Sequence, residues 1–224
     1  MKITHASFIK IIQKDYGDSF IKILSNRNFK DLIKEIDKIS DNAFDYGYVD
    51  TEIEDESKLG KYKLLGDLFE IFAESFFIQF RSDNRIGVFD YKPVPSDDDN
   101  GVDGFGKNIK GLPCTVQIKY RGNPSYLLKE RDIKQFAYQS IINYDIDWKK
   151  SDNMIIFTNC EGLHWYTDSK VFDNKIRVIN GDTISKLIDN NEGFWQTFKD
   201  LIFNSVKEIG VDKLTNIFKE KLSS

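Results

Sequence analysis

Polar and apolar residues alternate along TVQIKYR, residues 115–121. Successive side chains of a β-strand point to opposite faces, so Gln117 and Lys119 would share a polar face with Thr115 and Arg121. Gln117 could offer an amide oxygen to a hard cation. Lys119 could orient or deprotonate a water, or stabilise charge that develops on a phosphate. An ordinary amphipathic strand has the same pattern, but a polar face among largely apolar strands favours a functional role for these polar side chains.

Aspartates are concentrated just before this strand, in PSDDDNGVDGFG, residues 95–106. Carboxylates so close together repel, so such a run is either solvated or gathered by a cation. Asp97, Asp98 and Asp99 read as a loop. Asp103 differs, because the apolar neighbours and glycines around it favour a carboxylate fixed on a strand. The D-x-D-x-D-G spacing of a calcium-binding loop, with its distal Glu, is absent.

A third group of acidic residues lies on a predicted helix that runs from about Tyr62 to Phe80. Its apolar residues cover most of the circumference, which predicts burial on nearly all sides. The exception is a stripe on successive turns, made of Lys63, Asp67, Glu70 and Glu74. The stripe is either a thin solvent-facing strip or a set of carboxylates aimed into a polar cleft.

These residues are carried by elements that predict a mixed α/β fold. Short helices are expected before Asn42, broken at Gly17 and at residues 26–28, and helical patterns recur at 129–144, after the cap-like pair Asp182 and Thr183, and from 193 to 222. Strands are expected at residues 86–91, 101–105, 113–120, 153–158, 163–166 and 176–179, with a turn at 106–111. Helices that follow strands imply a mixed sheet with helical cover.

Three regions follow from this pattern. Residues 1–60 form an N-terminal helical region that ends in an acidic stretch, 46–61, read as a linker or an ordinary solvated loop. Residues 61–190 form the core, and residues 191–224 form a C-terminal helical tail.

Composition narrows the class of protein. The chain has 224 residues, 32 basic and 36 acidic side chains and a net charge of -4, which excludes nucleic-acid binding by bulk charge alone. Cys114 and Cys160 have no CxxC partner, so both read as buried thiols. We expect no signal peptide and no membrane span, and a cytoplasmic location.

Taken together, GDLFE (66–70), NGVDGFG (100–106) and the Gln117-Ile118-Lys119 strand resemble the catalytic core of the PD-(D/E)xK nuclease superfamily. The closest likeness is to its Mrr-like restriction endonuclease branch, in which Gln replaces the second acidic residue. Residues 154–167 and 176–188 resemble the strands and capped helix that close that domain, so the likeness covers roughly residues 64–190. No proline precedes Asp103, which departs from the superfamily's name.

The resemblance implies a restriction-endonuclease-like core with a central mixed sheet flanked by helices, plus N- and C-terminal helical extensions. It implies a metal-dependent endonuclease acting on duplex DNA. Asp103 and Glu70 would hold Mg²⁺, with Gln117 as the variant ligand and Lys119 as the catalytic lysine. Glu74 is the substitute for Glu70 if the helical register differs. Mn²⁺ would be able to replace Mg²⁺, and the neutral Gln favours a single-metal mechanism.

A DNA-binding surface is expected beside the site, because the chain is locally basic and aromatic there. Its candidate residues are Arg121, Lys129, Arg131 and Lys134. These could equally be ordinary exposed helix residues. A duplex break needs two cuts, so a homodimer is expected. The alternatives are a structure-specific or repair nuclease such as a junction resolvase, a non-catalytic DNA-binding module on the same fold, and a chance match on an α/β protein.

Overall fold

The computed structural model describes residues 13, 17–40, 56–94, 101–147, 149–150, 152–164 and 175–203. Several predictions lie outside these ranges: the Asp97 to Asp99 loop, most of the acidic linker and the tail beyond residue 203. The chain divides into two compact units. The first unit comprises residues 1–75 and 185–224, and the second comprises residues 76–184.

Helices make up the described part of the first unit. They are α2 (Gly17–Ser25), α3 (Phe29–Ser40), α4 (Glu56–Gln79) up to Ser75, the end of α6 (Gly181–Ile188) and α7 (Glu192–Phe203). Phe72 of α4 stacks on Phe29 at a ring-centroid distance of 5.3 Å and meets Phe194 and Phe198 edge-on. The N- and C-terminal segments therefore share one apolar core, although the sequence predicted them as separate regions.

Helix α4 begins at Glu56, so the end of the predicted acidic linker is helical. The predicted burial is confirmed along its described side chains: Leu65, Leu68, Phe69, Phe72 and Ala73 are all buried. The helix continues into the second unit, where Phe76 and Phe77 each pack against Phe157.

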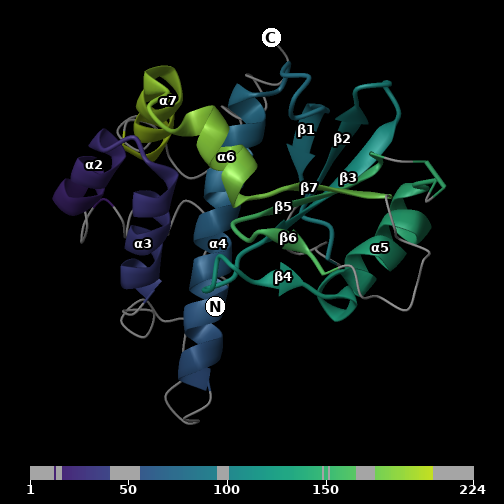
Figure 1. The fold of residues 1–224 in the computed structure, drawn as a ribbon, viewed down its shortest axis with the longest axis horizontal. Helices are drawn as coiled ribbons and strands as arrows, with labels where there is room; N and C mark the ends of the chain where they lie inside the picture. The colour runs from purple at the N-terminus through teal and green to yellow at the C-terminus, as the bar shows by residue number, and fades with distance from the viewer. Residues whose placement is uncertain are drawn as a thin grey trace. The chain divides into compact units, whose positions relative to one another are not determined.

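A five-stranded mixed sheet forms the centre of the second unit, in the order β1-β2-β3-β5-β7 (Figure 1). The strands are β1 (Val88–Pro93), β2 (Gly104–Asn108), β3 (Pro113–Lys119), β5 (Met154–Thr158) and β7 (Ile176–Ile179). The first three are antiparallel neighbours, and β3, β5 and β7 run parallel. A second, two-stranded sheet pairs β4 (Leu127–Leu128) with β6 (Gly162–Leu163). The predicted mixed sheet with helical cover is thereby confirmed.

Helix α5 (Glu130–Tyr144) covers one face of the five-stranded sheet. Its buried residues Ile133, Phe136 and Ala137 pack in a cluster with Met154 and Ile156 of β5. The opposite face is aromatic, since Tyr91 stacks on Phe77 with ring centroids 4.6 Å apart and Phe157 lies beside them. All five residues of β5 are buried, and all but Thr158 are apolar, because both faces of the strand are covered.

Two local predictions were wrong. Gly106 lies inside β2 and not in the turn. A glycine fits this position because an added Cβ would come within 2.6 Å of the Phe89 carbonyl oxygen of β1. Helix α6 starts at Gly181 and is capped by Asn180, whose Oδ1 accepts from Thr183 N at 2.9 Å, and not by the predicted Asp182 and Thr183 pair.

Both cysteines are free and buried in the second unit, as predicted. Burial raises the pKa of the Cys114 thiol to about 12. Burial also raises the pKa of Cys160 above its ordinary value.

Candidate metal centre

Strand β3 carries two of the predicted site residues at its carboxyl end. It is paired on both sides, antiparallel to β2 and parallel to β5. Because side chains alternate along a strand, Gln117 and Lys119 lie on one face and Ile118 on the other. The register pairs Gln117 with Ile156 and Lys119 with Thr158 of β5. Residues 156 and 158 therefore lie beside these two side chains on the face that α5 covers.

Asp103 lies immediately before β2 and contacts β3 directly. Its backbone N–H donates to the carbonyl of Val116 at 3.0 Å. Its carboxylate Oδ2 accepts from the backbone N–H of Ile118 at 2.5 Å. The carboxylate is thus held beside the backbone between Gln117 and Lys119. The structure brings Asp103, Gln117 and Lys119 together at one end of the β2–β3 pair.

Gln117 is buried, with an exposed fraction of 5%. Its Nε2 donates to the carbonyl oxygen of Gly101 at 3.2 Å. Its Oε1 is buried and has no hydrogen-bond partner. Exchanging the two amide atoms would set the oxygen against the Gly101 carbonyl, so hydrogen bonding favours the orientation observed.

An amide oxygen buried without a partner costs roughly 1–3 kcal/mol of desolvation. Such an oxygen is a suitable ligand for a hard divalent cation, and the nearby Asp103 supplies a carboxylate, the other ligand type that Mg²⁺ prefers. The donor set of these two residues fits a magnesium ion. Among the residues placed by the structure, no three His, Cys, Asp or Glu side chains cluster in a way that could hold a metal. The amide of Gln117 is not one of those four types.

Glu70 and Glu74 lie on α4, within the first unit. Glu74 has an exposed fraction of only 8%, and Glu70 is half-buried. A thin solvent-facing strip does not account for a buried Glu74. The roles of Glu70 as a metal ligand and of Glu74 as its substitute stay predictions.

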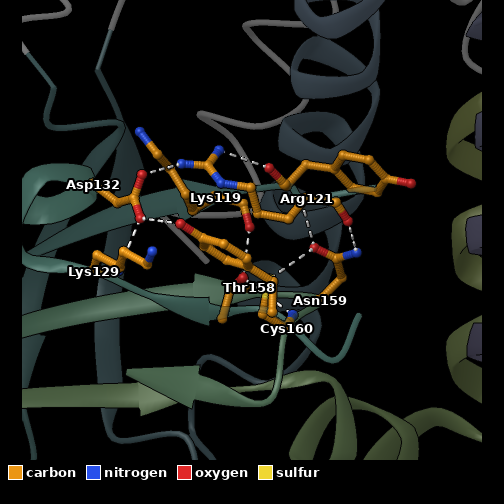
Figure 2. A network of polar contacts seen from close by, with 9 residues as sticks. Lys119, Arg121, Lys129, Asp132, Thr158, Asn159 and Cys160 are labelled. Carbon is orange, nitrogen blue, oxygen red and sulfur yellow. Dashed lines mark hydrogen bonds and ion pairs between the residues drawn. The ribbon is translucent and has the colours of Figure 1, made fainter. Parts of the chain in front are cut away.

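Lys119 is the last residue of β3 and is half-buried. Its carbonyl oxygen accepts from Thr158 Oγ1 at 2.7 Å. Two residues later, Arg121 N–H donates to Asn159 Oδ1 at 2.9 Å, and Asn159 Nδ2 donates to the Arg121 carbonyl at 2.7 Å. Figure 2 shows these contacts, which hold the chain where it leaves the strand.

Asp132 is the acidic centre of the same polar network. Its Oδ1 accepts from Arg121 Nη2 at 2.8 Å, and its Oδ2 accepts from the Lys129 N–H at 2.8 Å and from the Tyr126 hydroxyl at 3.1 Å. Burial acts to raise the pKa of Asp132, but the hydrogen bonds from Lys129 and Arg121 outweigh it, so this pKa lies below its ordinary value. The network joins the end of β3 to the first turn of α5.

The four predicted DNA-binding residues fall into two groups. Lys129, Arg131 and Lys134 are exposed at the start of α5. Arg121 instead directs its guanidinium to Asp132 and to the carbonyl of Tyr120, which lies 3.0 Å from Nη1. Its contact with DNA stays a prediction.

Sequence reasoning missed Asp132, Thr158 and Asn159. One signal was available for Asp132, because an acidic residue three positions after the start of a helix is typical of an N-terminal cap. Nothing in the sequence singles out Thr158 and Asn159, whose contacts depend on which strand lies beside β3.

Comparison with known proteins leaves the family open. No protein-family model matches this chain, and no curated protein matches it. In the ranges that the structure describes, no helix is long and apolar enough to cross a membrane.

Proposed function

We propose that this chain is a Mg²⁺-dependent DNA endonuclease that hydrolyses phosphodiester bonds in duplex DNA, with a PD-(D/E)xK core of the variant Gln-x-Lys type. The observation that carries the proposal is the buried Oε1 of Gln117, which has no hydrogen-bond partner and lies in a strand whose next residue binds Asp103. A buried acceptor of this kind is usually satisfied by an ion or an ordered water, and the carboxylate of Asp103 beside it favours a cation.

Asp103 and Gln117 would hold the metal, and the sequence-based prediction adds Glu70 as a further ligand. A bound Mg²⁺ would lower the pKa of a coordinated water and offset negative charge on the phosphate. Asp103 is suited to this role because Ile118 N–H fixes its carboxylate. Mn²⁺ has the same preference for oxygen ligands and would substitute.

Lys119 would act on the attacking water and on the phosphate. An ammonium group is a compact charge with three donors, so it can orient a water and stabilise charge on a phosphate oxygen. Its position two residues after Gln117 on the same strand face keeps it beside the proposed metal ligands.

The exposed residues Lys129, Arg131 and Lys134 would bind the DNA backbone. Phosphate contacts from Lys and Arg place a duplex without reading its sequence. Arg121 is the fourth proposed contact; its guanidinium also binds Asp132. The proposal includes a homodimer, which would cut both strands, and a cytoplasmic location.

The test of catalysis compares two lysines of the β2–β3 hairpin. Purified wild-type protein with Mg²⁺ is expected to nick or linearise plasmid DNA. Lys119→Ala should lower the cleavage rate at least about a hundredfold, with an unchanged circular-dichroism spectrum. Lys110→Ala is the matched control, since Lys110 is exposed in the turn, and should stay within about twofold of wild type.

The test of the metal ligands does not depend on cleavage. Mn²⁺ binding measured by electron paramagnetic resonance should weaken at least about tenfold in Gln117→Leu. Gln139→Leu is the control, because Gln139 lies on α5, where its Oε1 accepts from Asn143 Nδ2. Equal Mn²⁺ affinity in wild type and Gln117→Leu would remove Gln117 from the site.

The choice of DNA separates the remaining alternatives. Preferential cleavage of a four-way junction over plain duplex would replace the restriction-type proposal with a junction resolvase. DNA binding without cleavage under every metal and DNA form, equally in wild type and Lys119→Ala, would leave a binding module.

A further inference from the structure

The chain that follows β3 is held by two side chains at the end of β5. The β3–β5 ladder ends with the pair Lys119 and Thr158. Thr158 Oγ1 donates to the Lys119 carbonyl, and Asn159 binds both the N–H and the carbonyl of Arg121 (Figure 2). These contacts begin where the regular ladder stops, so they extend its order by two residues.

Both side chains are shielded from water, with exposed fractions of 0% for Thr158 and 5% for Asn159. The Asn159 amide has a partner on each of its two polar atoms. Thr158 Oγ1 is also the acceptor for the Cys160 N–H at 3.2 Å. Fully satisfied polar contacts in a buried place are strong and rigid, since water does not compete with them.

A third contact ties the same segment to α5. The Arg121 guanidinium lies 6.0 Å from the centre of the Tyr126 ring and binds Asp132. Asp132 is in turn held by Lys129 N–H and the Tyr126 hydroxyl. The segment from Lys119 to Arg121 is therefore restrained from the strand side at both ends and from the helix side at Arg121.

We propose that Thr158 and Asn159 are positioning residues that fix the backbone of Lys119 to Arg121, so that the Lys119 ammonium is held in place for the reaction. This inference rests on the proposed function. A lysine has a flexible four-carbon stem, so its ammonium can be placed reproducibly only if the backbone that carries it does not move. A displacement of about 1 Å at a reacting group can cost about a hundredfold in rate.

A purely structural role predicts a different outcome. The pairing of β3 with β5 already holds the backbone from Thr115 to Lys119. If Thr158 and Asn159 had only a structural role, their replacement would lower the stability of the protein and leave the turnover of the molecules that remain folded unchanged. A positioning role lowers turnover in protein that is still folded and still binds DNA.

The experiment uses the full chain and a matched pair of variants. Thr158→Val removes the hydroxyl and Thr158→Ser keeps it. Asn159→Ala removes the clamp on Arg121. Turnover is measured with Mg²⁺, and DNA affinity is measured separately with Ca²⁺ in its place. Hydrogen exchange of the Arg121 amide reports the clamp itself, and the NMR signals of the Lys119 side chain report the order of its ammonium.

Thr158→Val and Asn159→Ala are each expected to lower kcat about tenfold or more, with the DNA dissociation constant within about twofold of wild type. Thr158→Ser should restore kcat to within about twofold. Asn159→Ala should expose the Arg121 amide to faster exchange. The inference is overturned if Asn159→Ala loses that protection and Thr158→Val folds normally, yet both keep the wild-type kcat.

Failure of the proposed function looks different. If wild-type protein cleaves no DNA, the nuclease proposal fails, and the NMR measurement alone decides the positioning role. A Lys119 side chain that is ordered in wild type and averaged in Thr158→Val and Asn159→Ala supports the role. Identical spectra in all three proteins overturn it.

Discussion

Asp132 shows how much one carboxylate can organise. It accepts hydrogen bonds from a guanidinium, a backbone N–H and a phenol, and so joins Arg121 of the β3 end to the first turn of α5. Because the charged form makes these bonds, the pKa of Asp132 lies below 3.8, its ordinary value. The stabilisation is fully present above that ordinary value and is lost as pH falls through the lower pKa of the folded state.

Replacement of this carboxylate should therefore have a pH-dependent cost. Asp132→Asn is expected to lower the free energy of unfolding by about 1–2 kcal/mol at pH 7, because it weakens charge-assisted hydrogen bonds. The difference from wild type should shrink as the pH is lowered below about 4. Urea denaturation at a series of pH values measures both quantities.

Glu130→Gln serves as the control, since Glu130 lies in the same first turn. It should change the free energy by less than about 0.5 kcal/mol at pH 7. A cost of Asp132→Asn that is the same at pH 7 and at pH 3 would contradict the role of its charge.

At the level of single residues, the alternation along β3 was enough to predict that Gln117 and Lys119 share a face. The sequence could not predict that Nε2 of Gln117 has a hydrogen-bond partner while Oε1 has none. The partner of Nε2 is the carbonyl of Gly101, sixteen positions earlier in the chain. The sequence predicts a DNA contact for Arg121 because the chain around it is basic and aromatic and lies beside the candidate site. Its partner Asp132 became apparent only once α5 was placed against the sheet.

Among the elements, the packing of β1 on β2 rests on a glycine. A Cβ on Gly104 would lie 2.3 Å from Tyr91 Cε2 and 2.6 Å from its hydroxyl oxygen. Tyr91 cannot easily move aside, because its ring is stacked on Phe77 and fully buried. Asp103 immediately precedes Gly104, so this close approach also fixes the position of Asp103 at the start of β2.

Gly104→Ala is expected to lower the free energy of unfolding by about 1–3 kcal/mol through overpacking. Gly122→Ala is the matched control, because an added Cβ there meets nothing within 4 Å. Thermal and urea denaturation of the two variants give the comparison. Equal midpoints would mean that β1 adjusts freely to a larger side chain at this position.

The existence and order of most described elements followed from periodicity, but their boundaries depended on contacts. Asn108 closes the β2–β3 turn, since its Oδ1 accepts from the N–H groups of Lys110 and Leu112. Its Nδ2 also donates to Asn153 at 2.7 Å, which no local pattern reveals. The glycines near this turn indicated its presence and misplaced its start.

On the scale of the whole chain, the sequence indicated three consecutive regions and the structure groups the chain differently. Residues near the two ends belong to one unit, in which Arg27 forms an ion pair with Glu192 and Phe29 N–H donates to Asp189. An amphipathic pattern shows that a helix has an apolar face. It does not show which other helix will cover that face, so a unit built from distant segments could not be predicted.

The reactivity of the two buried cysteines reports how often the second unit opens to solvent. Only a thiolate reacts with disulfide reagents, and Cys114 is both buried and shifted in pKa to about 12. At pH 8 we expect Ellman's reagent to modify the native thiols roughly a thousandfold more slowly than those of protein in denaturant. Fast modification of the native protein would contradict the burial.

Cys114 sits in β3 and Cys160 follows β5, so the two thiols lie in the strand segments that carry the proposed site. Single Cys114→Ala and Cys160→Ala variants assign each labelling rate to its own sulfur. The absorbance change of the reaction with Ellman's reagent can thus report how often β3 and β5 separate in the native protein, with no fluorophore and no isotope.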